Sequence, residues 1–166
     1  MIDPTIDILK TLFLRELDGL IDEIEAYPDD DALWKKAPAI ENPGGTLALH
    51  LAGNLRHFVG ASMAGSDYTR DRKAEFSRTD LTRSEVAGTI RAAREEVARA
   101  LGSMTEADLE LSAPLHGFEP PPGRRRFLIH LLSHLAYHLG QVDYHRRFVS
   151  GGGGAVGVLD LRRMQR

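Results

Sequence analysis

The sequence contains no cysteine and only one tryptophan, Trp34. Without cysteine the chain forms no disulfide and offers no thiolate to a metal ion, so histidine, aspartate and glutamate remain as the strong ligands. Any metal site in this protein must therefore be built on imidazole groups.

Long apolar runs and clusters of basic residues are also missing. No segment approaches the roughly 18 uninterrupted apolar residues of a membrane span, and the N-terminal MIDPTIDILK lacks the pattern of a signal peptide. The net charge is -3, and basic residues alternate with acidic ones. This distribution gives no electrostatic footprint for nucleic acid. We expect a soluble, cytoplasmic protein with no nucleic-acid or membrane partner.

The length and the apolar content indicate one globular domain. The chain has 166 residues, of which 42% are hydrophobic, which is enough to bury a core without disulfide or metal staples. The run from Gly151 to Gly154 interrupts regular structure. Residues 1–150 are therefore the expected domain. Residues 151–166 are a Gly-rich C-terminal tail, expected to add a short turn or to be loosely ordered.

The first two amphipathic patterns lie in the N-terminal part of the chain. Asp3 is placed to cap a helix that has Pro4 at its first position, and apolar residues recur every three or four positions up to about Tyr27. A second helix is predicted to begin with Thr46 as its cap and to continue until Gly65.

Two further amphipathic patterns complete the predicted all-α fold. Thr82 and Glu85 fit a capping box that opens a third helix, from residue 84 to about 101. The fourth and clearest helical pattern runs over residues 126–148. The residues expected to fill the core of these helices are Leu9, Phe13, Leu51, Leu55, Phe58, Ile90, Val97, Leu131, Leu135 and Leu139.

The connections between these helices are rich in Asp, Pro and Gly. The segment 28–45 predicts a loop with at most one short turn, in which Trp34 covers one end of the core. The segment 65–81 is charged and mostly aperiodic, which indicates a long connection, with a single helical turn as the alternative. The segment 103–124 is predicted to be a loop, because Pro120 to Pro122 cannot lie inside a helix.

The fourth helix carries four of the seven histidines. At about 100° per residue, His134, His138 and His145 fall about 40°, 80° and 60° from His130, so the four share one stripe beside the apolar face. His134 and His138 stand one turn apart and lean over the same patch, which lets them hold one metal ion. The pair His134 and His138 lies closer to the apolar face than the equally spaced pair His130 and His134 does. His130 points towards water. His145 lies about 10 Å farther along the axis.

A third ligand must come from another segment. His50 and His57 on the second helix lie roughly 10 Å apart along its axis, so only one of them reaches a site that spans a single turn. Asn54, between them, is either a hydrogen-bonding neighbour of a ligand or a solvated helix residue. Gln141 and His57 are candidates to orient a ligand or a substrate, or are structural. His116 is expected to be an exposed loop residue.

Two motifs resemble one family. The fourth helix, with His134-Leu-Ala-Tyr-His138-Leu-Gly-Gln141, resembles the His-x-x-x-His-x-Gly-Gln signature of the DinB-like bundle proteins. The segment LHLAGNLRHF resembles the region in which this family places its first histidine, and His50 matches that position. The segment YTRDRKAEFS is similar to a linker found in one branch of the family.

The resemblance implies a four-helix bundle with up-down-down-up topology. It also implies a divalent metal ion, usually zinc or nickel, held at one end of the bundle by His50, His134 and His138, and a tendency to form homodimers. Some relatives are metal-dependent transferases or isomerases that use low-molecular-weight thiols. The sequence departs from the common pattern at Leu139, where many relatives have Arg, and in its additional His130 and His145.

Two functions follow from these residues. Three imidazole ligands leave a fourth coordination position open, as in catalytic zinc sites, which suits a thiol-dependent S-transferase or a related hydrolase with a small-molecule substrate. The segment between His134 and His138 contains no Glu, which argues against a peptidase. The alternative is a non-catalytic helical bundle with a structural or vestigial metal site that binds a small molecule or a partner. The absence of a paired acid and base favours this alternative.

Overall fold

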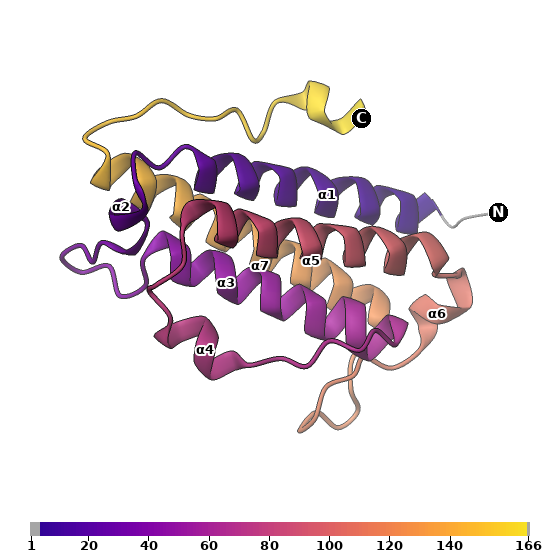
Figure 1. Cartoon of the computed structure of the whole chain (residues 1–166). Helices are drawn as coiled ribbons and strands as arrows, with labels where there is room; N and C mark the ends of the chain where they lie inside the picture. The colour runs from indigo at the N-terminus through magenta and orange to yellow at the C-terminus, as the bar shows by residue number, and fades with distance from the viewer. Residues whose placement is uncertain (1–3, 166) are drawn as a thin grey trace.

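Helices dominate the computed structural model, which describes residues 4–165 (Figure 1). No strand occurs in this range, where the isolated bridges Ala37–Ile40 and Ser112–Gly123 are the β-type pairings. The all-α prediction is confirmed. The elements are α1 (Pro4–Glu25), α2 (Asp30–Trp34), α3 (Gly44–Leu55), the π-helical continuation η1 (Arg56–Met63), α4 (Arg72–Ser77), α5 (Arg83–Ser103), α6 (Glu106–Glu110), α7 (Arg124–Val149) and the 3₁₀ helix η2 (Leu161–Gln165).

The long helices lie side by side, and each packs mainly against two others. Helix α1 contacts α5 and α7, and α3 also contacts α5 and α7. Helices α1 and α7 run in one direction, whereas α3 and α5 run in the other (Figure 1). Because α3 and α7 are antiparallel neighbours, side chains from the middle of one face side chains from the middle of the other.

The core contains nearly all of the residues expected there. Nine of the ten predicted core residues are buried, and Phe58 is partly buried and packs against them. Leu135 on α7 is fully buried. These observations confirm that the apolar faces of the helices were assigned correctly from their periodicity.

The start of α5 agrees with the prediction, because a capping side chain determines it. The Thr82 side chain accepts a hydrogen bond from the backbone N–H of Glu85, and Glu85 accepts one from the backbone N–H of Thr82, so the predicted capping box is present. Asp3, the expected cap of α1, lies outside the described residues.

The predicted cap of the second helix is wrong. Helix α3 begins at Gly44 after Pro43, so Thr46 lies inside the helix. A Cβ atom on Gly44 would lie 1.9 Å from the hydroxyl oxygen of Tyr27, and one on Gly45 would lie 2.5 Å from the Trp34 ring. The two glycines therefore permit close aromatic packing within the first turn rather than stopping the helix.

All three connections contain a short helix. The segment 28–45 includes α2, which agrees with the one short turn expected there. The segment 65–81 includes α4, where the Asp71 side chain accepts a hydrogen bond from the Ala74 N–H, so the single helical turn weighed as the alternative is the better description. The segment 103–124, predicted as a loop only, includes α6, which opens with a second capping box formed by Thr105 and Asp108.

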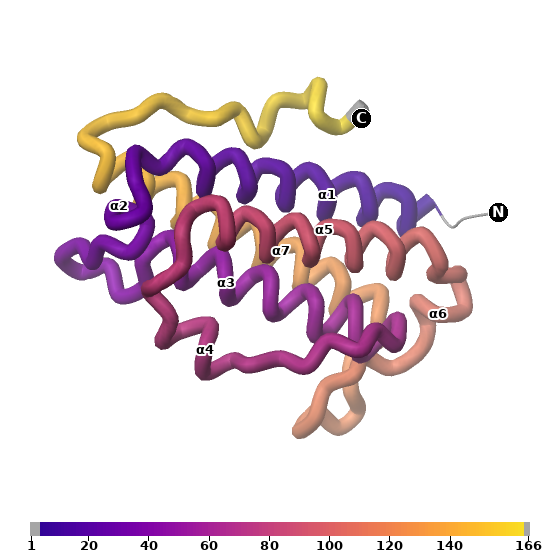
Figure 2. The backbone as a smooth tube through the Cα atoms, viewed as in Figure 1, coloured from indigo at the N-terminus to yellow at the C-terminus, as the bar shows by residue number. Residues whose placement is uncertain are grey.

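The Gly-rich tail runs back along α1 (Figure 2). Val158 packs closely against Gly19, and Arg163 forms an ion pair of 2.7 Å with Asp22. Arg146 on α7 donates a hydrogen bond of 2.8 Å to the Gly154 carbonyl. The tail is therefore fixed by specific contacts and ends in η2, which agrees with the expected short turn. Across residues 4–165, no helix combines the length and the apolar character that crossing a bilayer requires.

Candidate metal site

Three histidines from two antiparallel helices meet between α3 and α7. One ring nitrogen of each of His50, His134 and His138 lies within 4.8 Å of the others. The Nε2 atoms of His50 and His134 are 3.3 Å apart. The ring planes of each pair are close to perpendicular, at 81° to 89°, and the ring centroids are 4.6 to 5.7 Å apart. The rings therefore converge on a common volume.

The separation of the His50 and His134 nitrogens fits a small divalent cation. With metal–nitrogen bonds of about 2.0–2.1 Å, two ligands of a tetrahedral ion lie about 3.3–3.4 Å apart. The Nε2 distance of 3.3 Å between His50 and His134 matches this requirement. His134 and His138 lie near the middle of α7 (Arg124–Val149), ten and fourteen residues after its start. The cluster is therefore not at one end of the bundle, where the resemblance places the metal.

The protonation states also suit a metal site. Imidazole binds a metal only when it is neutral. Burial lowers the pKa of His50. Burial, together with repulsion from the nearby His138 and His50, lowers the pKa of His134 to about 4. At neutral pH both rings are therefore neutral and available as ligands.

A buried carboxylate behind His50 was not predicted. Glu75, on α4, lies with Oε2 at 3.1 Å from Nδ1 of His50. Arg70 donates two hydrogen bonds to the Glu75 carboxylate, at 2.7 and 2.8 Å. Arg70 and Glu75 lie in the segment YTRDRKAEFS, whose lack of a helical period predicts a charged connection and gives no sign of a contact with His50.

The other candidate residues differ in position. The Gln141 side-chain oxygen lies 2.6 Å from Nδ1 of His138, so Gln141 contacts the cluster. Asn54 is 8% exposed, which rules out the solvated alternative, and its Oδ1 has no hydrogen-bond partner among the described residues. His57 lies on η1 and packs edge-on against Phe58, outside the cluster.

The three remaining histidines are not part of the cluster. His130 is exposed and stacks at 6.4 Å on the His134 ring, as expected for a residue that faces water. His116 is exposed, also as expected. His145, which shares the stripe beside the apolar face, is only 1% exposed. It accepts a hydrogen bond from Tyr27, at 2.7 Å, and lies 2.8 Å from the Lys35 carbonyl oxygen.

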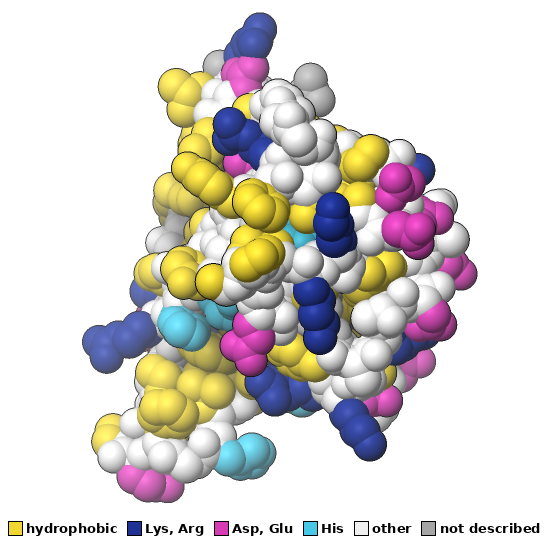
Figure 3. Space-filling model, turned by 90° about the vertical axis from the view of Figure 1, so that its left-hand side faces the viewer, with side chains coloured by type: hydrophobic (Ala, Val, Ile, Leu, Met, Phe, Trp, Pro, Cys, Tyr) yellow, Lys and Arg dark blue, Asp and Glu magenta, His cyan; other side chains and the backbone are white. Residues whose placement is uncertain are grey.

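A cavity adjoins the cluster through His138. It has a volume of about 410 Å³ and lies between the loop at residues 39–42, Leu47 at the start of α3, and α7, which contributes Tyr137, Gln141 and Tyr144. Figure 3 shows histidine side chains among hydrophobic ones on this side of the molecule. The cavity thus combines an apolar wall with one histidine of the cluster.

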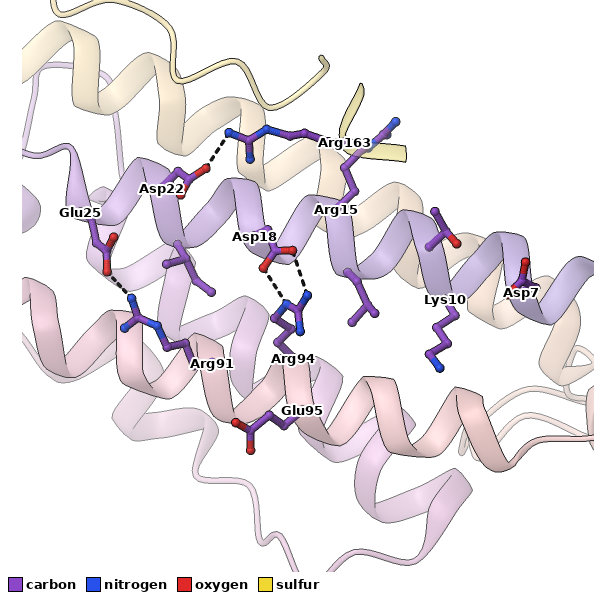
Figure 4. A pocket seen from close by; sticks show the side chains of 13 residues that line it. Asp7, Lys10, Arg15, Asp18, Asp22, Glu25, Arg91, Arg94, Glu95 and Arg163 are labelled. Atoms are coloured by element: carbon purple, nitrogen blue, oxygen red, sulfur yellow. Dashed lines mark hydrogen bonds and ion pairs between the residues drawn. The ribbon is translucent and has the colours of Figure 1, made fainter. Parts of the chain in front are cut away.

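A larger cavity lies elsewhere and has a different character. Its volume is about 840 Å³, and it lies between α1 and α5 with Arg163 of the tail at its edge (Figure 4). Its charged side chains are largely paired with one another, as in Arg94 with Asp18 and Arg91 with Glu25. Because these pairs neutralise each other and no histidine lines the cavity, it is a weaker candidate for chemistry.

The helical fold and the histidine cluster define a DinB-like protein. The chain belongs to the mycothiol-S-transferase family, whose model matches residues 8–151. Its fold is similar to the crystal structure of the conserved protein of locus from Enterococcus faecalis, with a TM-score of 0.70 and 17% sequence identity. The similarity covers 91% of this chain and 99% of that one. No curated protein matches the chain.

Proposed function

We propose that this protein is a metal-dependent S-transferase that uses a low-molecular-weight thiol, with His50, His134 and His138 as the ligands of a divalent cation. The observation that carries the proposal is the convergence of three imidazoles in a chain of the mycothiol-S-transferase family. Imidazole ligands suit both zinc and nickel, so either metal meets the proposal.

The metal would supply a Lewis-acidic position at which a thiol loses its proton near neutral pH. The residues of the chain keep this position accessible. Gln141 holds His138 by its Nδ1 atom, so the Nε2 atom of that ring remains available to the site. The second substrate, an electrophile, would lie in the cavity of about 410 Å³ against Tyr137 and Tyr144. A related hydrolase would use the same position for water.

A non-catalytic bundle is the second candidate function. Among the described residues that line this cavity, Glu41 is the one carboxylate, and no acid–base pair is present. A structural metal site, or a site that only binds a small molecule, needs no such pair.

An activity assay separates these two functions. The protein loaded with zinc or nickel is incubated with a low-molecular-weight thiol and a panel of electrophiles, and thiol consumption is followed. We expect consumption that depends on the metal and is lost in His134→Ala but kept in His130→Ala. Stoichiometric metal without turnover of any electrophile would favour the non-catalytic bundle.

The wider architecture also remains a proposal. The directions of α1, α3, α5 and α7 support a four-helix bundle with up-down-down-up topology in one domain (Figure 1). The outer side of α7 supports a homodimer, because Ile129, Tyr137, Tyr144 and Phe148 are 53%, 66%, 74% and 63% exposed and lie within about 100° of one another around the helix. Analytical ultracentrifugation tests the dimer, and a monomer at every concentration would exclude it. A cytoplasmic location stays a prediction.

A further inference from the structure

The least exposed charged side chains near the cluster form an ion pair that the proposed chemistry does not use. The Arg70 side chain is 13% exposed and that of Glu75 is 6% exposed. Arg70 Nε donates to Oε1 of Glu75 at 2.7 Å, and its Nη2 donates to Oε2 at 2.8 Å. Such a two-point contact fixes the plane of the carboxylate as well as its position. Glu75 is therefore held in one orientation, with Oε2 towards α3.

The fixed carboxylate faces the side of His50 that points away from the other histidines. Oε2 of Glu75 lies 3.1 Å from Nδ1 of His50, whereas Nε2 of the same ring faces His134. A neutral imidazole carries one proton, and the hydrogen bond made by one nitrogen decides which nitrogen is free to bind a metal. We propose that Glu75, held by Arg70, is a positioning residue that keeps the proton of His50 on Nδ1 and leaves Nε2 free for the metal.

Arg70 makes this role necessary. Its Nη2 atom lies 3.3 Å from the same Nδ1 atom. A guanidinium only donates hydrogen bonds, so it would favour the opposite tautomer of His50, in which Nδ1 is the acceptor and Nε2 carries the proton. A ring in that tautomer cannot bind a metal through Nε2. The carboxylate of Glu75 therefore decides the tautomer, and Arg70 contributes by holding the carboxylate.

Helix α3 is shaped to admit this carboxylate. Gly53 lies three residues after His50, and a Cβ atom at this position would lie 2.1 Å from Oε1 of Glu75. This separation is far shorter than any contact between non-bonded atoms, so even alanine would displace Glu75. Phe76 follows Glu75 on α4, and its ring lies 5.1 Å from that of His50. Gly53 and Phe76 thus help to place the support on one side of the histidine.

The first experiment measures affinity for Zn²⁺ by competition with a chromogenic chelator, using the full chain. We expect Glu75→Gln to bind Zn²⁺ about 10–100-fold more weakly than the wild type, as is typical when the partner of a metal-bound histidine is removed. The matched control is Glu96→Gln, which breaks the part-buried Arg56–Glu96 ion pair without touching a histidine. This control should keep the wild-type affinity.

A second pair of variants keeps every charged side chain. Gly53→Ala should weaken Zn²⁺ binding in the same direction as Glu75→Gln, because it pushes the carboxylate away. Gly88→Ala is its control, since Gly88 lies on α5 and a Cβ atom there meets no heavy atom within 4 Å. If Glu75→Gln does not fold, the glycine pair still decides. Wild-type affinity in both Glu75→Gln and Gly53→Ala would overturn the inference.

The tautomer itself gives a readout that does not need the metal. Nitrogen-15 NMR of the metal-free protein at pH 8 should show the His50 proton on Nδ1 in the wild type and on Nε2 in Glu75→Gln. The role in metal binding rests on the proposed function, and the two fail differently. A wild type that binds no Zn²⁺ would end the proposed metal site, whereas an unchanged tautomer in Glu75→Gln would end the role of Glu75.

Discussion

His145 and His134 of α7 have different hydrogen-bond partners, although both lie on the same helical stripe. His145 uses both ring nitrogens inside the fold, because Nδ1 accepts from the Tyr27 hydroxyl and from the Gly44 N–H, and Nε2 donates to the Lys35 carbonyl. The Nε2 atom of His134 instead faces the Nε2 atom of His50. Neutral imidazole groups that face one another with few other partners offer lone pairs to a cation. The difference teaches that the partners of a histidine, more than its burial, separate a structural residue from a candidate ligand.

The largest expected effect concerns metal content. Because three ligands hold the ion, His50→Ala, His134→Ala and His138→Ala should each lose most of the bound metal. His130→Ala and His145→Ala should keep it. Elemental analysis of the five purified variants measures this difference. Metal kept by His138→Ala but lost by His130→Ala would mean that the site lies one turn nearer the start of α7.

The next effect concerns Leu135, the neighbour of His134 on the buried side of α7. Leu135 is fully buried, and truncating such a residue costs about 2–5 kcal/mol of unfolding free energy. We expect Leu135→Ala to lose stability of this size in chemical denaturation while each folded molecule keeps its metal. An unchanged stability would contradict the assignment of the core face.

A smaller loss is expected at His145. His145→Ala removes the 2.7 Å partner of the buried Tyr27 hydroxyl, which keeps a longer contact of 3.4 Å to the Val142 carbonyl, and it also removes the donor to the Lys35 carbonyl. Such a loss costs about 1–3 kcal/mol. Thermal or urea unfolding measures the change, and His130→Ala is the exposed control. If His145→Ala were as stable as the wild type, His145 would have no structural role. The contrast between a structural His145 and the candidate ligand His134 would then be wrong.

The smallest effect is a dependence of stability on pH. The folded-state pKa of His134 is lowered to about 4, chiefly by burial, whereas an unfolded histidine has a pKa of about 6.5. Between these values the unfolded state binds more protons, so the contribution of His134 is complete above pH 6.5 and is lost as the pH falls towards 4. The metal-free wild type should therefore lose more stability than His134→Gln between pH 7 and pH 5. Parallel curves for the two proteins would contradict this expectation.

The sequence predicted those features that one helix or one short motif determines. The α5 capping box and the core face of α7 needed only local spacing, and so did the approach of His134 to His138. The recognised motif supplied His50. Residues whose role depends on distant partners were missed, because periodicity describes a single helix. Glu75 lies 25 positions from His50, and Tyr27 lies 118 positions from His145.

The C-terminal tail lies outside the family match but packs against the helices. The family match stops at residue 151, and the sequence suggested a boundary at 150, so the tail is outside the part of the chain that defines the family. In the fold, however, Val158 fills the space left by Gly19, and Arg146 connects the buried Glu23 to the Gly154 carbonyl. A chain that ends at residue 151 would leave Arg146 with an unused donor and Gly19 facing solvent. The part of the chain that matches the family model is therefore shorter than the part that packs together, and protein for experiments should include the tail.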